Sequence, residues 1–411
     1  MYRMALKMAW ASLTGRATRS LMVVLMICVS LWGLLLMQGV YDGMTEQMIA
    51  SAIRSDSGEL SIFGRGYRLD PSLALLVGAT AEEGQRLNEI LTEDPRVRSM
   101  VKRLRQTGLV ATAHYSRNIE IYGVDLEKEA IHGSLQESLV EGEYSFGDEE
   151  KGAIIGFRLA RKLQVGVGKK IIVSAQDAHS DITSIALRVT GILKTNNMSL
   201  DENAVFFDLG RARKFLAVPG GVSQISLMLM NEKDIAPLQH DLVQSFPALE
   251  VLRWDELYPA LMQSRIIMKG FSLVVSGMIF AVVGLGIFGV MLVSVLERMR
   301  EFGIMLAIGT SFSQIRLIIV AESLLMGLAG FAAGAFCGFL TLFYFKIYGL
   351  DLTMFSEAFE EFGVDAVTHA LIRPDYFITA FVAVLLATLV SVYFPLRMLK
   401  KSNPIEVINE V

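Results

Sequence analysis

The sequence is poor in the residue types that form covalent cross-links and metal sites. Its 411 residues include only two cysteines, Cys28 and Cys337, and both lie inside long apolar segments. This position argues against a disulfide framework and predicts that both thiols pack against apolar neighbours. The few histidines have no partner three or four residues away, so the sequence predicts no metal site; they are His114, His132, His179, His240 and His369.

Catalytic motifs are also missing. The sequence contains no Gly-x-Ser-x-Gly elbow. Residues 166–170 resemble a phosphate loop only superficially, because Leu163 replaces its first glycine and Lys170 its Ser or Thr. We expect a turn there that leads into a strand. The net charge of −4 argues against a nucleic-acid partner. The sequence therefore predicts a chain without catalytic residues.

Long apolar segments dominate what the sequence does contain. Hydrophobic residues make up 53% of the chain and its mean hydropathy is +0.46, yet 19% of the residues are charged. The chain therefore belongs partly in a bilayer and partly in water. A helix needs ~20 apolar residues to cross about 30 Å of hydrocarbon, and this length predicts transmembrane helices at residues 20–41, 270–296, 317–345 and 376–396. We interpret the first as a retained anchor, because its apolar core is longer than that of a secretory signal.

Charge asymmetry between the flanking segments predicts the orientation of these helices. The amphipathic arm at residues 1–19 carries basic residues and no acid, and the tail at residues 397–411 begins with basic residues. The loop at residues 346–375 is acidic instead. The positive-inside rule therefore places both termini and residues 297–316 in the cytoplasm, with residues 42–269 and the acidic loop outside.

Residues 42–269 are numerous enough for one or two compact domains and show a mixed α/β pattern. Their composition and alternation predict strands at residues 59–64, 118–124, 170–174, 185–193, 204–208 and 224–230. Helical periodicity predicts helices at residues 81–91 and 234–246. The predicted fold is an α-helical membrane protein with four transmembrane helices and a mixed α/β domain inserted between the first and the second.

Both junctions between this domain and the membrane have a helical pattern of apolar residues. The positions are Met44, Met48 and Ala52 after the first apolar segment, and Leu257, Leu261 and Met268 before the second. Ordinary interfacial turns would explain the pattern. The alternative is a pair of stalk helices, one at each end of the domain. A helix is stiff enough to carry a displacement over tens of ångströms, which a flexible linker is not.

A short charged segment, residues 297–309, separates the second and third apolar segments. Centring several charges in hydrocarbon costs roughly 2.5–3.5 kcal/mol each, so this segment faces water and is available to another protein. Glu322 is the one acid of the third apolar segment. It either pairs locally near the interface or takes part in a proton relay.

Residues 297–309 closely resemble the E-R-x-R-E-I-G-I-x-x-A-x-G-A motif of the MacB-type superfamily of ABC transporter permeases, which includes MacB, FtsX, LolC and LolE. Similar features are found elsewhere in the chain: Pro395, Arg397 and residues 403–406 near the C-terminus, and residues 152–156 in the outer domain. The order of one span, a large domain and three further spans is also that of the superfamily.

This resemblance implies that residues 297–316 form a coupling helix that docks into a cleft on a cytoplasmic ABC ATPase dimer. Mixed charges would fix the docking register, and apolar side chains would add contact area. The implied coupling residues are Glu297, Arg298, Arg300, Glu301, Phe302, Gly303, Ile304, Ala307 and Gly309. The resemblance also implies a bacterial inner-membrane location, pairing with a second copy or a sister permease, and ATP and Mg²⁺ bound by the ATPase alone. The sequence contains no fused nucleotide-binding domain, so we expect the ATPase to be another chain.

The implied function is mechanotransmission, in which ATP binding and hydrolysis move the periplasmic domain and extract a lipoprotein or another amphiphile from the membrane. LolC carries a long hook that captures a periplasmic carrier, but only residues 175–183 occupy that place here. This short connection argues against direct hand-off to a carrier. Two alternatives remain open: an FtsX-like signalling module that controls a periplasmic hydrolase, and a MacB-like export pump that works with a periplasmic adaptor.

Overall fold

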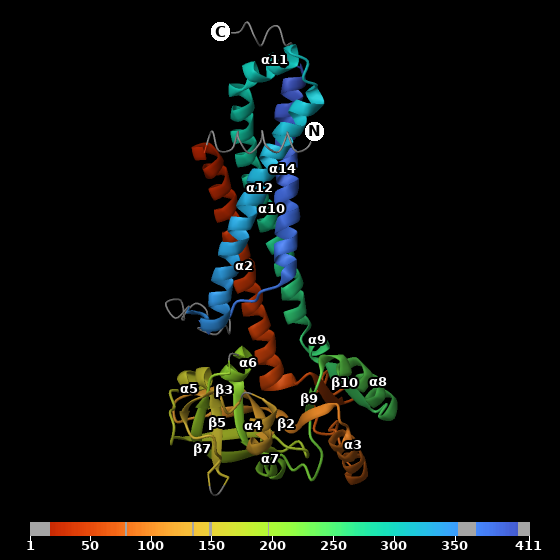
Figure 1. The fold of residues 1–411 in the computed structure, drawn as a ribbon. Helices are drawn as coiled ribbons and strands as arrows, with labels where there is room; N and C mark the ends of the chain where they lie inside the picture. Colours follow the sequence, from red (N-terminus) through yellow and green to blue (C-terminus); the bar gives the residue numbers. More distant parts are fainter. Residues whose placement is uncertain are drawn as a thin grey trace. The chain divides into compact units, whose positions relative to one another are not determined.

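A computed structural model describes residues 17–401 except residues 79, 134, 148–149, 196 and 352–366. The chain forms two compact units, which we call the helical unit and the sheet unit (Figure 1). Within the described residues, the helical unit comprises residues 17–45, 265–351 and 367–401, and the sheet unit comprises residues 46–264. The predicted combination of four long apolar helices and a mixed α/β domain is confirmed.

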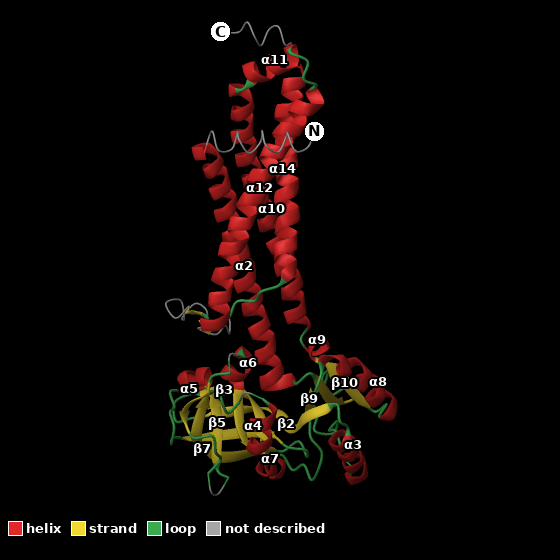
Figure 2. Ribbon diagram, viewed as in Figure 1, coloured by secondary structure: helices red, strands yellow, loops and turns green. Residues whose placement is uncertain are grey.

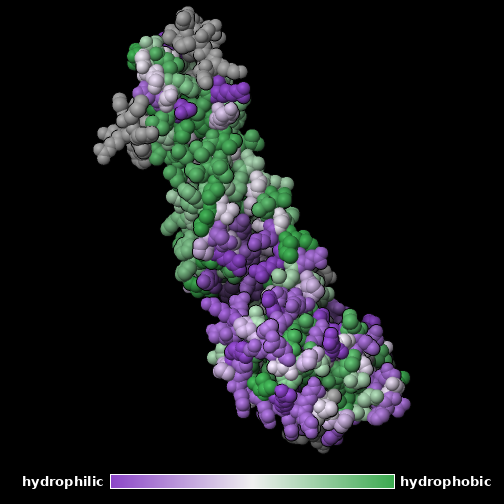
Figure 3. All heavy atoms as spheres, turned by 90° about the vertical axis from the view of Figure 1, so that its right-hand side faces the viewer, coloured by the Kyte–Doolittle hydropathy of each residue, from purple (hydrophilic) through white to green (hydrophobic). Residues whose placement is uncertain are grey.

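Four long helices dominate the helical unit (Figure 2). They are α2 (Ala17–Ala52), α10 (Pro259–Glu297), α12 (Phe312–Tyr348) and α14 (Pro374–Lys401). Each contains one of the predicted apolar segments and is long and apolar enough to cross a membrane. Hydrophobic residues cover much of this unit's surface in Figure 3, as expected for side chains that face lipid. The unit also holds the paired strands β11 (Leu350–Asp351) and β12 (Val367–Thr368).

Helices α2 and α12 pack closely through glycines. Gly330, Gly334 and Gly338 recur every four residues along α12 and face α2. A Cβ atom at Gly334 would lie 2.9 Å from the carbonyl oxygen of Cys28, and one at Gly330 would lie 2.7 Å from Cβ of Ile27. Small residues at this spacing let helix backbones approach closely in membranes. The corresponding G-x-x-x-G-x-x-x-G pattern lies in the third apolar segment of the sequence.

The sheet unit is built on a ten-stranded mixed sheet with the order β10-β1-β9-β2-β3-β8-β5-β7-β4, in which β6 pairs with β2 and β7. Its strands are β1 (Leu60–Gly64), β2 (Val97–Ala111), β3 (Ser116–Val124), β4 (Leu139–Gly142), β5 (Gly152–Gly156), β6 (Lys170–Gln176), β7 (Ile182–Leu193), β8 (Ala204–Asp208), β9 (Gln224–Leu229) and β10 (Leu249–Arg253). All six predicted strands are confirmed, with small differences at their ends.

Strand β2 belongs to both halves of this sheet. Its first half pairs with β9, and its second half pairs with β3 and β6. One hydrophobic core forms around β3, β5, β7 and β8, and the other forms around β1, β9 and β10. Leu104 of β2 is fully buried in the first core, and Met100 packs against the second. A single strand of 15 residues therefore connects the two cores.

Helices cover the sheet at several places. The two predicted helices are confirmed as α3 (Ala81–Glu93) and α8 (Ile235–Ser245). The remaining helices are short and were not predicted: α4 (Leu126–His132), α5 (Phe157–Leu163), α6 (Met198–Asn203), α7 (Leu209–Phe215), α9 (Trp254–Leu257) and the 3₁₀ turn η2 (Glu232–Asp234).

The connection between β6 and β7 is a tight hairpin. Gln176 is paired with Ile182, so only residues 177–181 lie in the turn. The Asp177 carboxylate closes it by accepting hydrogen bonds from the backbone N–H groups of His179 (2.9 Å) and Asp181 (3.0 Å). The predicted short connection is confirmed, and this position carries no extended hook.

Candidate functional site

The charged segment forms a short helix between two turns rather than one helix over residues 297–316. Helix α10 ends at Glu297, and Arg298 leaves helical geometry with φ −103° and ψ 8°. Helix α11 then runs over Met299–Ala307, across the end of the helical unit in Figure 1. Gly309 adopts the left-handed region with φ 95°, which ends α11 at low cost because glycine has no Cβ. The prediction of a single coupling helix is therefore wrong in extent, because these two turns interrupt it.

One face of α11 is buried against its own unit. Phe302 is only 1% exposed and packs with Ile315 and Ile319 of α12, and Gly303 is buried beside it. Phe302 and Gly303, both predicted as coupling residues, therefore fix α11 on the helical unit instead of offering a surface to a partner.

Arg298 connects this segment to α12 through an ion pair. Its Nη1 lies 3.0 Å from Oε2 of Glu322, and its Nε donates to Oε2 of Glu301 at 3.0 Å. Its guanidinium also lies 4.9 Å from the ring centre of Phe302, within cation–π range. The side chains of Arg298 and Glu322 are only 14% and 8% exposed. Of the two interpretations of Glu322, this contact supports the local ion pair.

The opposite face of α11 is exposed and mixes charge with apolar area. Ile304 and Ile308 are 48% and 77% exposed, and Arg300 and Glu301 are exposed next to them. We call these four residues the α11 face. Three other predicted coupling residues, Glu297, Ala307 and Gly309, are exposed at its ends. The sequence indicated that this charged segment faces water but did not separate its outward side chains from the inward ones.

The two predicted stalk patterns have different outcomes. Helix α2 continues past Met44 and Met48, both half-buried, to Ala52, where a π-helical turn, η1 (Ile53–Ser57), begins. Before the second apolar segment, Leu257 lies in α9, and α10 starts only at Pro259. The prediction that Leu257, Leu261 and Met268 share one helix is therefore wrong. The side chains of Leu261 and Met268 lie outside the described residues.

Proline explains this interruption. Pro259 has no N–H to donate and a fixed φ, so it suits the first position of a helix but not its interior. Its ring also disfavours helical geometry at the preceding residue, and Tyr258 adopts φ −116° and ψ 64°. Two helical segments thus meet at Tyr258.

A hydrogen bond joins the ends of α2 and α10 within the sheet unit. The Tyr258 hydroxyl donates to Oδ2 of Asp56, in η1, at 2.5 Å. The other carboxylate oxygen of Asp56 lies 3.2 Å from Nη1 of Arg105. Burial raises the pKa of Asp56, but Arg105, Arg103 and the Tyr258 hydroxyl outweigh it and hold the pKa below its usual value. Asp56 is therefore an ionised centre that connects both helix ends with strand β2.

Arg103 extends this network into the core of the sheet unit. It is 1% exposed and forms a two-pronged contact with Glu129 of α4, with Nε to Oε1 at 2.6 Å and Nη2 to Oε2 at 2.7 Å. Its Nη1 also donates to the backbone carbonyl of Asp56. Arg105 pairs in turn with Glu120 at 2.9 Å. We call Asp56, Arg103, Arg105, Glu120, Glu129 and Tyr258 the Asp56 network. Each buried cation in this network has a carboxylate partner.

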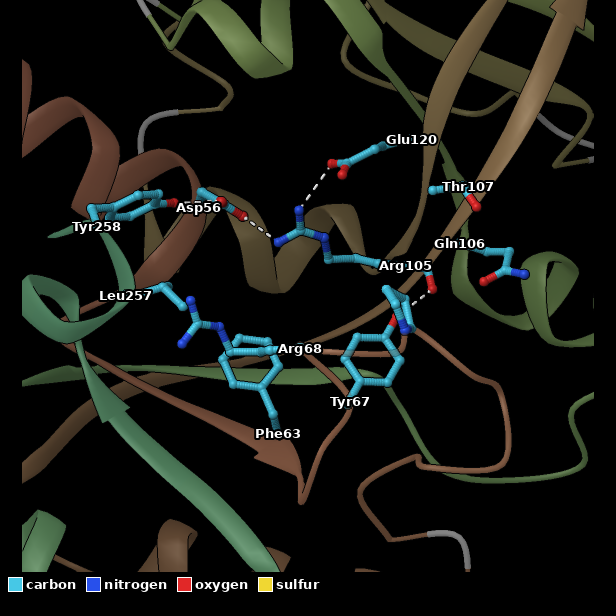
Figure 4. A pocket seen from close by; sticks show the side chains of 11 residues that line it. Asp56, Phe63, Tyr67, Arg68, Arg105, Gln106, Thr107, Glu120, Leu257 and Tyr258 are labelled. Carbon is cyan, nitrogen blue, oxygen red and sulfur yellow. Dashed lines mark hydrogen bonds and ion pairs between the residues drawn. The ribbon is translucent and has the colours of Figure 1, made fainter. Parts of the chain in front are cut away.

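A cavity of about 240 Å³ opens beside the Asp56 network (Figure 4). Phe63, Tyr67 and Arg68 line it together with Arg105 and Tyr258. The Tyr67 hydroxyl donates to the backbone carbonyl of Arg105 at 2.9 Å. At this cavity Arg105 pairs with Asp56 and Glu120, and none of these groups forms the nucleophile-and-base pair of a covalent catalyst. The arrangement is suited to fixing positions rather than to chemistry.

None of the residues of the Asp56 network was predicted as a site residue. A signal was present, because Arg103 and Arg105 lie two residues apart and hence on one face of a strand. Their carboxylate partners are distant in sequence, so no local pattern connects them.

His132 gives the sheet unit a predictable pH dependence. It is buried on α4, with Nδ1 3.0 Å from Oγ of Ser99, and burial followed by the charge of Arg103 lowers its pKa from 6.5 to about 3. The unfolded chain therefore takes up a proton at higher pH than the folded one. Between about pH 6.5 and pH 3 we expect His132 to reduce the free energy of unfolding by about 1.4 kcal/mol per pH unit as pH falls. Urea midpoints at pH 7 and pH 5 test this: the wild type should lose stability and His132→Gln should lose less. An equal loss of stability in the wild type and His132→Gln would refute this prediction.

Four helices long and apolar enough to cross a membrane, with an α/β domain between the first and the second, define a multi-pass membrane protein. Two family models match this chain: the MacB-like periplasmic core domain over residues 20–245, and the FtsX-like permease C-terminal region over residues 273–404. The chain belongs to the MacB/FtsX-type superfamily of ABC transporter permeases.

Curated relatives agree with this assignment. An uncharacterized ABC transporter permease of Methanocaldococcus jannaschii is 23% identical over 294 residues, which cover 69% of each chain. The lipoprotein-releasing system transmembrane protein LolE of Haemophilus influenzae is 21% identical over 288 residues, which cover 68% of this chain and 67% of LolE. The macrolide export ATP-binding/permease protein MacB of Haemophilus ducreyi is 26% identical over 46% of this chain and 26% of its own length.

Two solved structures of related transporter domains overlap part of this chain. The extracellular domain of the ABC-type transporter YknZ from Gram-positive bacteria matches with a TM-score of 0.33 and 14% identity, covering 47% of this chain and 99% of that domain. The periplasmic region of MacB from Actinobacillus actinomycetemcomitans matches with a TM-score of 0.36 and 12% identity, covering 52% of this chain and 97% of that region.

Proposed function

We propose that this chain is the permease subunit of an ABC transporter in the bacterial inner membrane, with both termini in the cytoplasm. A separate cytoplasmic ATPase dimer binds ATP and Mg²⁺ and docks on the α11 face. The permease pairs with a second copy or a sister permease, and nucleotide-driven closure of the ATPase dimer moves its sheet unit in the periplasm. The observation that carries this proposal is the α11 face, an exposed mixed surface on a helix whose other side is anchored to the membrane helices.

The α11 face has the properties of a docking surface. Arg300 and Glu301 offer opposite charges that favour one orientation of a partner, and Ile304 and Ile308 offer apolar area that gains free energy when it leaves water. The Arg298–Glu322 ion pair and buried Phe302 hold α11 against α12. A force applied to α11 is therefore passed to the membrane helices rather than absorbed by a loose loop.

The ends of α2 and α10 would carry the displacement from the membrane helices into the sheet unit. Helix α2 is uninterrupted from its apolar segment to Ala52, and η1 follows it directly with Asp56. Helix α10 begins next to Tyr258, which is bonded to Asp56. A displacement of either helix end is thus delivered to one ion network and through Arg103 and Arg105 to strand β2. This supports the stalk interpretation over ordinary interfacial turns.

The proposed cargo is a lipoprotein or another amphiphile that the moving sheet unit extracts from the membrane. LolE, a relative over two thirds of this chain, is named for lipoprotein release. The five-residue turn between β6 and β7 leaves no hook for a periplasmic carrier. We therefore propose release without direct hand-off at this position. Purification of the chain in nanodiscs, followed by mass spectrometry of the ATPase and the hydrophobic cargo that co-elute, tests both partners; recovery of neither would contradict the proposal.

A flexible insertion in α2 tests the transmission. Four Gly-Ser residues after Met48 should leave ATP hydrolysis nearly unchanged and reduce ATP-dependent release of a triacylated lipoprotein from proteoliposomes at least tenfold, because a flexible segment does not carry displacement. The matched control places the same residues after His179, in the exposed β6–β7 turn, and should release cargo normally. Normal release with the Met48 insertion would show that α2 does not act as a stalk.

A further inference from the structure

A second cavity in the sheet unit has a different character from the one beside the Asp56 network. It has a volume of about 320 Å³ and lies where the start of α3, strand β2, the end of α7 and the loop at residues 220–222 meet. A water molecule occupies about 30 Å³ of liquid, so the space corresponds to roughly ten waters. This is the lower end of the range for small-molecule sites, about 300–1,000 Å³.

Two cations line this cavity without a counter-charge. Nζ of Lys102 donates to the amide oxygen of Asn88 at 2.8 Å, and Nη2 of Arg213 donates to the carbonyl of Gly221 at 3.3 Å. Nε of Arg213 is buried and has no partner among the described residues. Among the described residues, no Asp or Glu lines the cavity, and neither Lys102 nor Arg213 forms an ion pair.

The contrast with the Asp56 network shows that this arrangement is unusual for the unit. Arg103 and Arg105 each pair with carboxylates where they are buried. At Lys102, by contrast, burial lowers the pKa, and the positive charges of Lys128 and Arg213 lower it further. The fold thus brings like charges together at a half-buried place, where a bound anion would be favoured.

We propose that this cavity binds the anionic group of a small organic ligand, a phosphate monoester or diester, with Lys102 and Arg213 as its charged contacts. Arginine and lysine are the usual protein partners of phosphate oxygens. Thr80, Gln85 and Asn88 line the same space and supply hydroxyl and amide groups for the hydroxyls of a polyol phosphate. The phosphate belongs either to a soluble metabolite or to a phospholipid headgroup. The inference is independent of the proposed transport function, because it concerns binding alone.

Isothermal titration of the full chain in phosphatidylcholine nanodiscs tests this site. One arm uses glycerol 3-phosphate and the other a short-chain phosphatidylglycerol below its micelle concentration. Saturable binding in the first arm identifies a soluble phosphate, and binding in the second arm alone identifies a lipid headgroup. Lys102→Met and Arg213→Met should each weaken binding about tenfold or more, whereas Lys102→Arg should retain most of it. Lys233→Met, which removes an exposed cation of η2, is the matched control and should bind as the wild type does.

Stability measurements distinguish a binding role from a structural one. Without ligand, Lys102→Met should unfold at the same temperature as the wild type or higher, because it removes the repulsion from Arg213. Ligand should raise the unfolding temperature of the wild type and of Lys233→Met but not of Lys102→Met. The proposal is overturned by the absence of saturable binding in both arms, or by binding that neither Lys102→Met nor Arg213→Met weakens.

Discussion

Replacing Ile304 and Ile308 with aspartate is expected to reduce the affinity of the permease for its ATPase by a factor of about 10²–10⁴. Ile304 on α11 is about half exposed, and Ile308, directly after the helix, is largely exposed. Burying one such side chain gains about 1.5–3 kcal/mol, and each 1.4 kcal/mol corresponds to a tenfold change in affinity. The introduced carboxylates would add the cost of desolvating a charge. Pull-down of the ATPase by the permease in detergent, quantified by titration, measures the effect.

The matched control for this experiment is available in the same chain. Ile131 and Ile182 are 75% and 84% exposed in the sheet unit, so their joint replacement by aspartate makes the same chemical change away from α11. That variant should bind the ATPase normally. Arg298 is unsuitable for the test, because its loss would leave Glu322 buried without this partner and destabilise α11 itself. Equal ATPase binding by the two double variants would refute docking on the α11 face.

Replacing Glu129 with alanine is expected to lower the free energy of unfolding of the sheet unit by about 3–5 kcal/mol. Glu129 is fully buried and holds both edges of the Arg103 guanidinium. Removing one partner of a buried ion pair is costly because it leaves the other charge uncompensated in a medium of low dielectric. The urea midpoint of unfolding, followed by the fluorescence of Trp254 with the other tryptophans replaced by phenylalanine, measures the loss.

Glu127 provides the control for this loss. It lies on the same helix, α4, but is exposed, so Glu127→Ala should change stability by no more than about 1 kcal/mol. The substitution Glu129→Gln, which keeps a hydrogen-bond acceptor, should fall between the two. A Glu129→Ala midpoint equal to that of Glu127→Ala would mean that the Asp56 network does not stabilise the sheet unit.

Much of the fold could be predicted because its strongest signals are local. The four membrane helices follow from length and hydrophobicity alone. Strands such as β7 and β8 are rich in β-branched and aromatic residues, which read clearly as strands. Strand β2 was not predicted, because its basic residues interrupt the apolar pattern expected of a strand. Two of those residues, Arg103 and Arg105, are the ones that build the Asp56 network, so the missed strand and the missed site have one cause.

The charged segment at residues 297–309 could be recognised from the sequence, but the roles of its individual side chains could not. Composition located the charged segment, but the partner of Arg298 is Glu322, on another helix. No pattern within residues 297–309 could have assigned Arg298 an internal role. Leu257 is a different case, because Pro259 was visible in the sequence and the restriction on the residue before proline could have separated α9 from α10. A tertiary contact determines the role of Arg298, whereas local stereochemistry at Pro259 determines the break between α9 and α10.

Sharing β2 between two hydrophobic cores limits how the sheet unit can deform. Pairing of β2 with β9 ends at Arg103 and pairing with β3 begins at Leu104, so a bend between the cores would disturb the adjoining ends of both ladders, whose hydrogen bonds are each worth about 0.5–1.5 kcal/mol. We therefore expect the sheet unit to turn largely as one body when the ends of α2 and α10 are displaced. In the proposed transporter, the gap that opens or closes around cargo would then be the gap between two neighbouring permeases, and its width would be set by their rotation instead of by any change of shape within one.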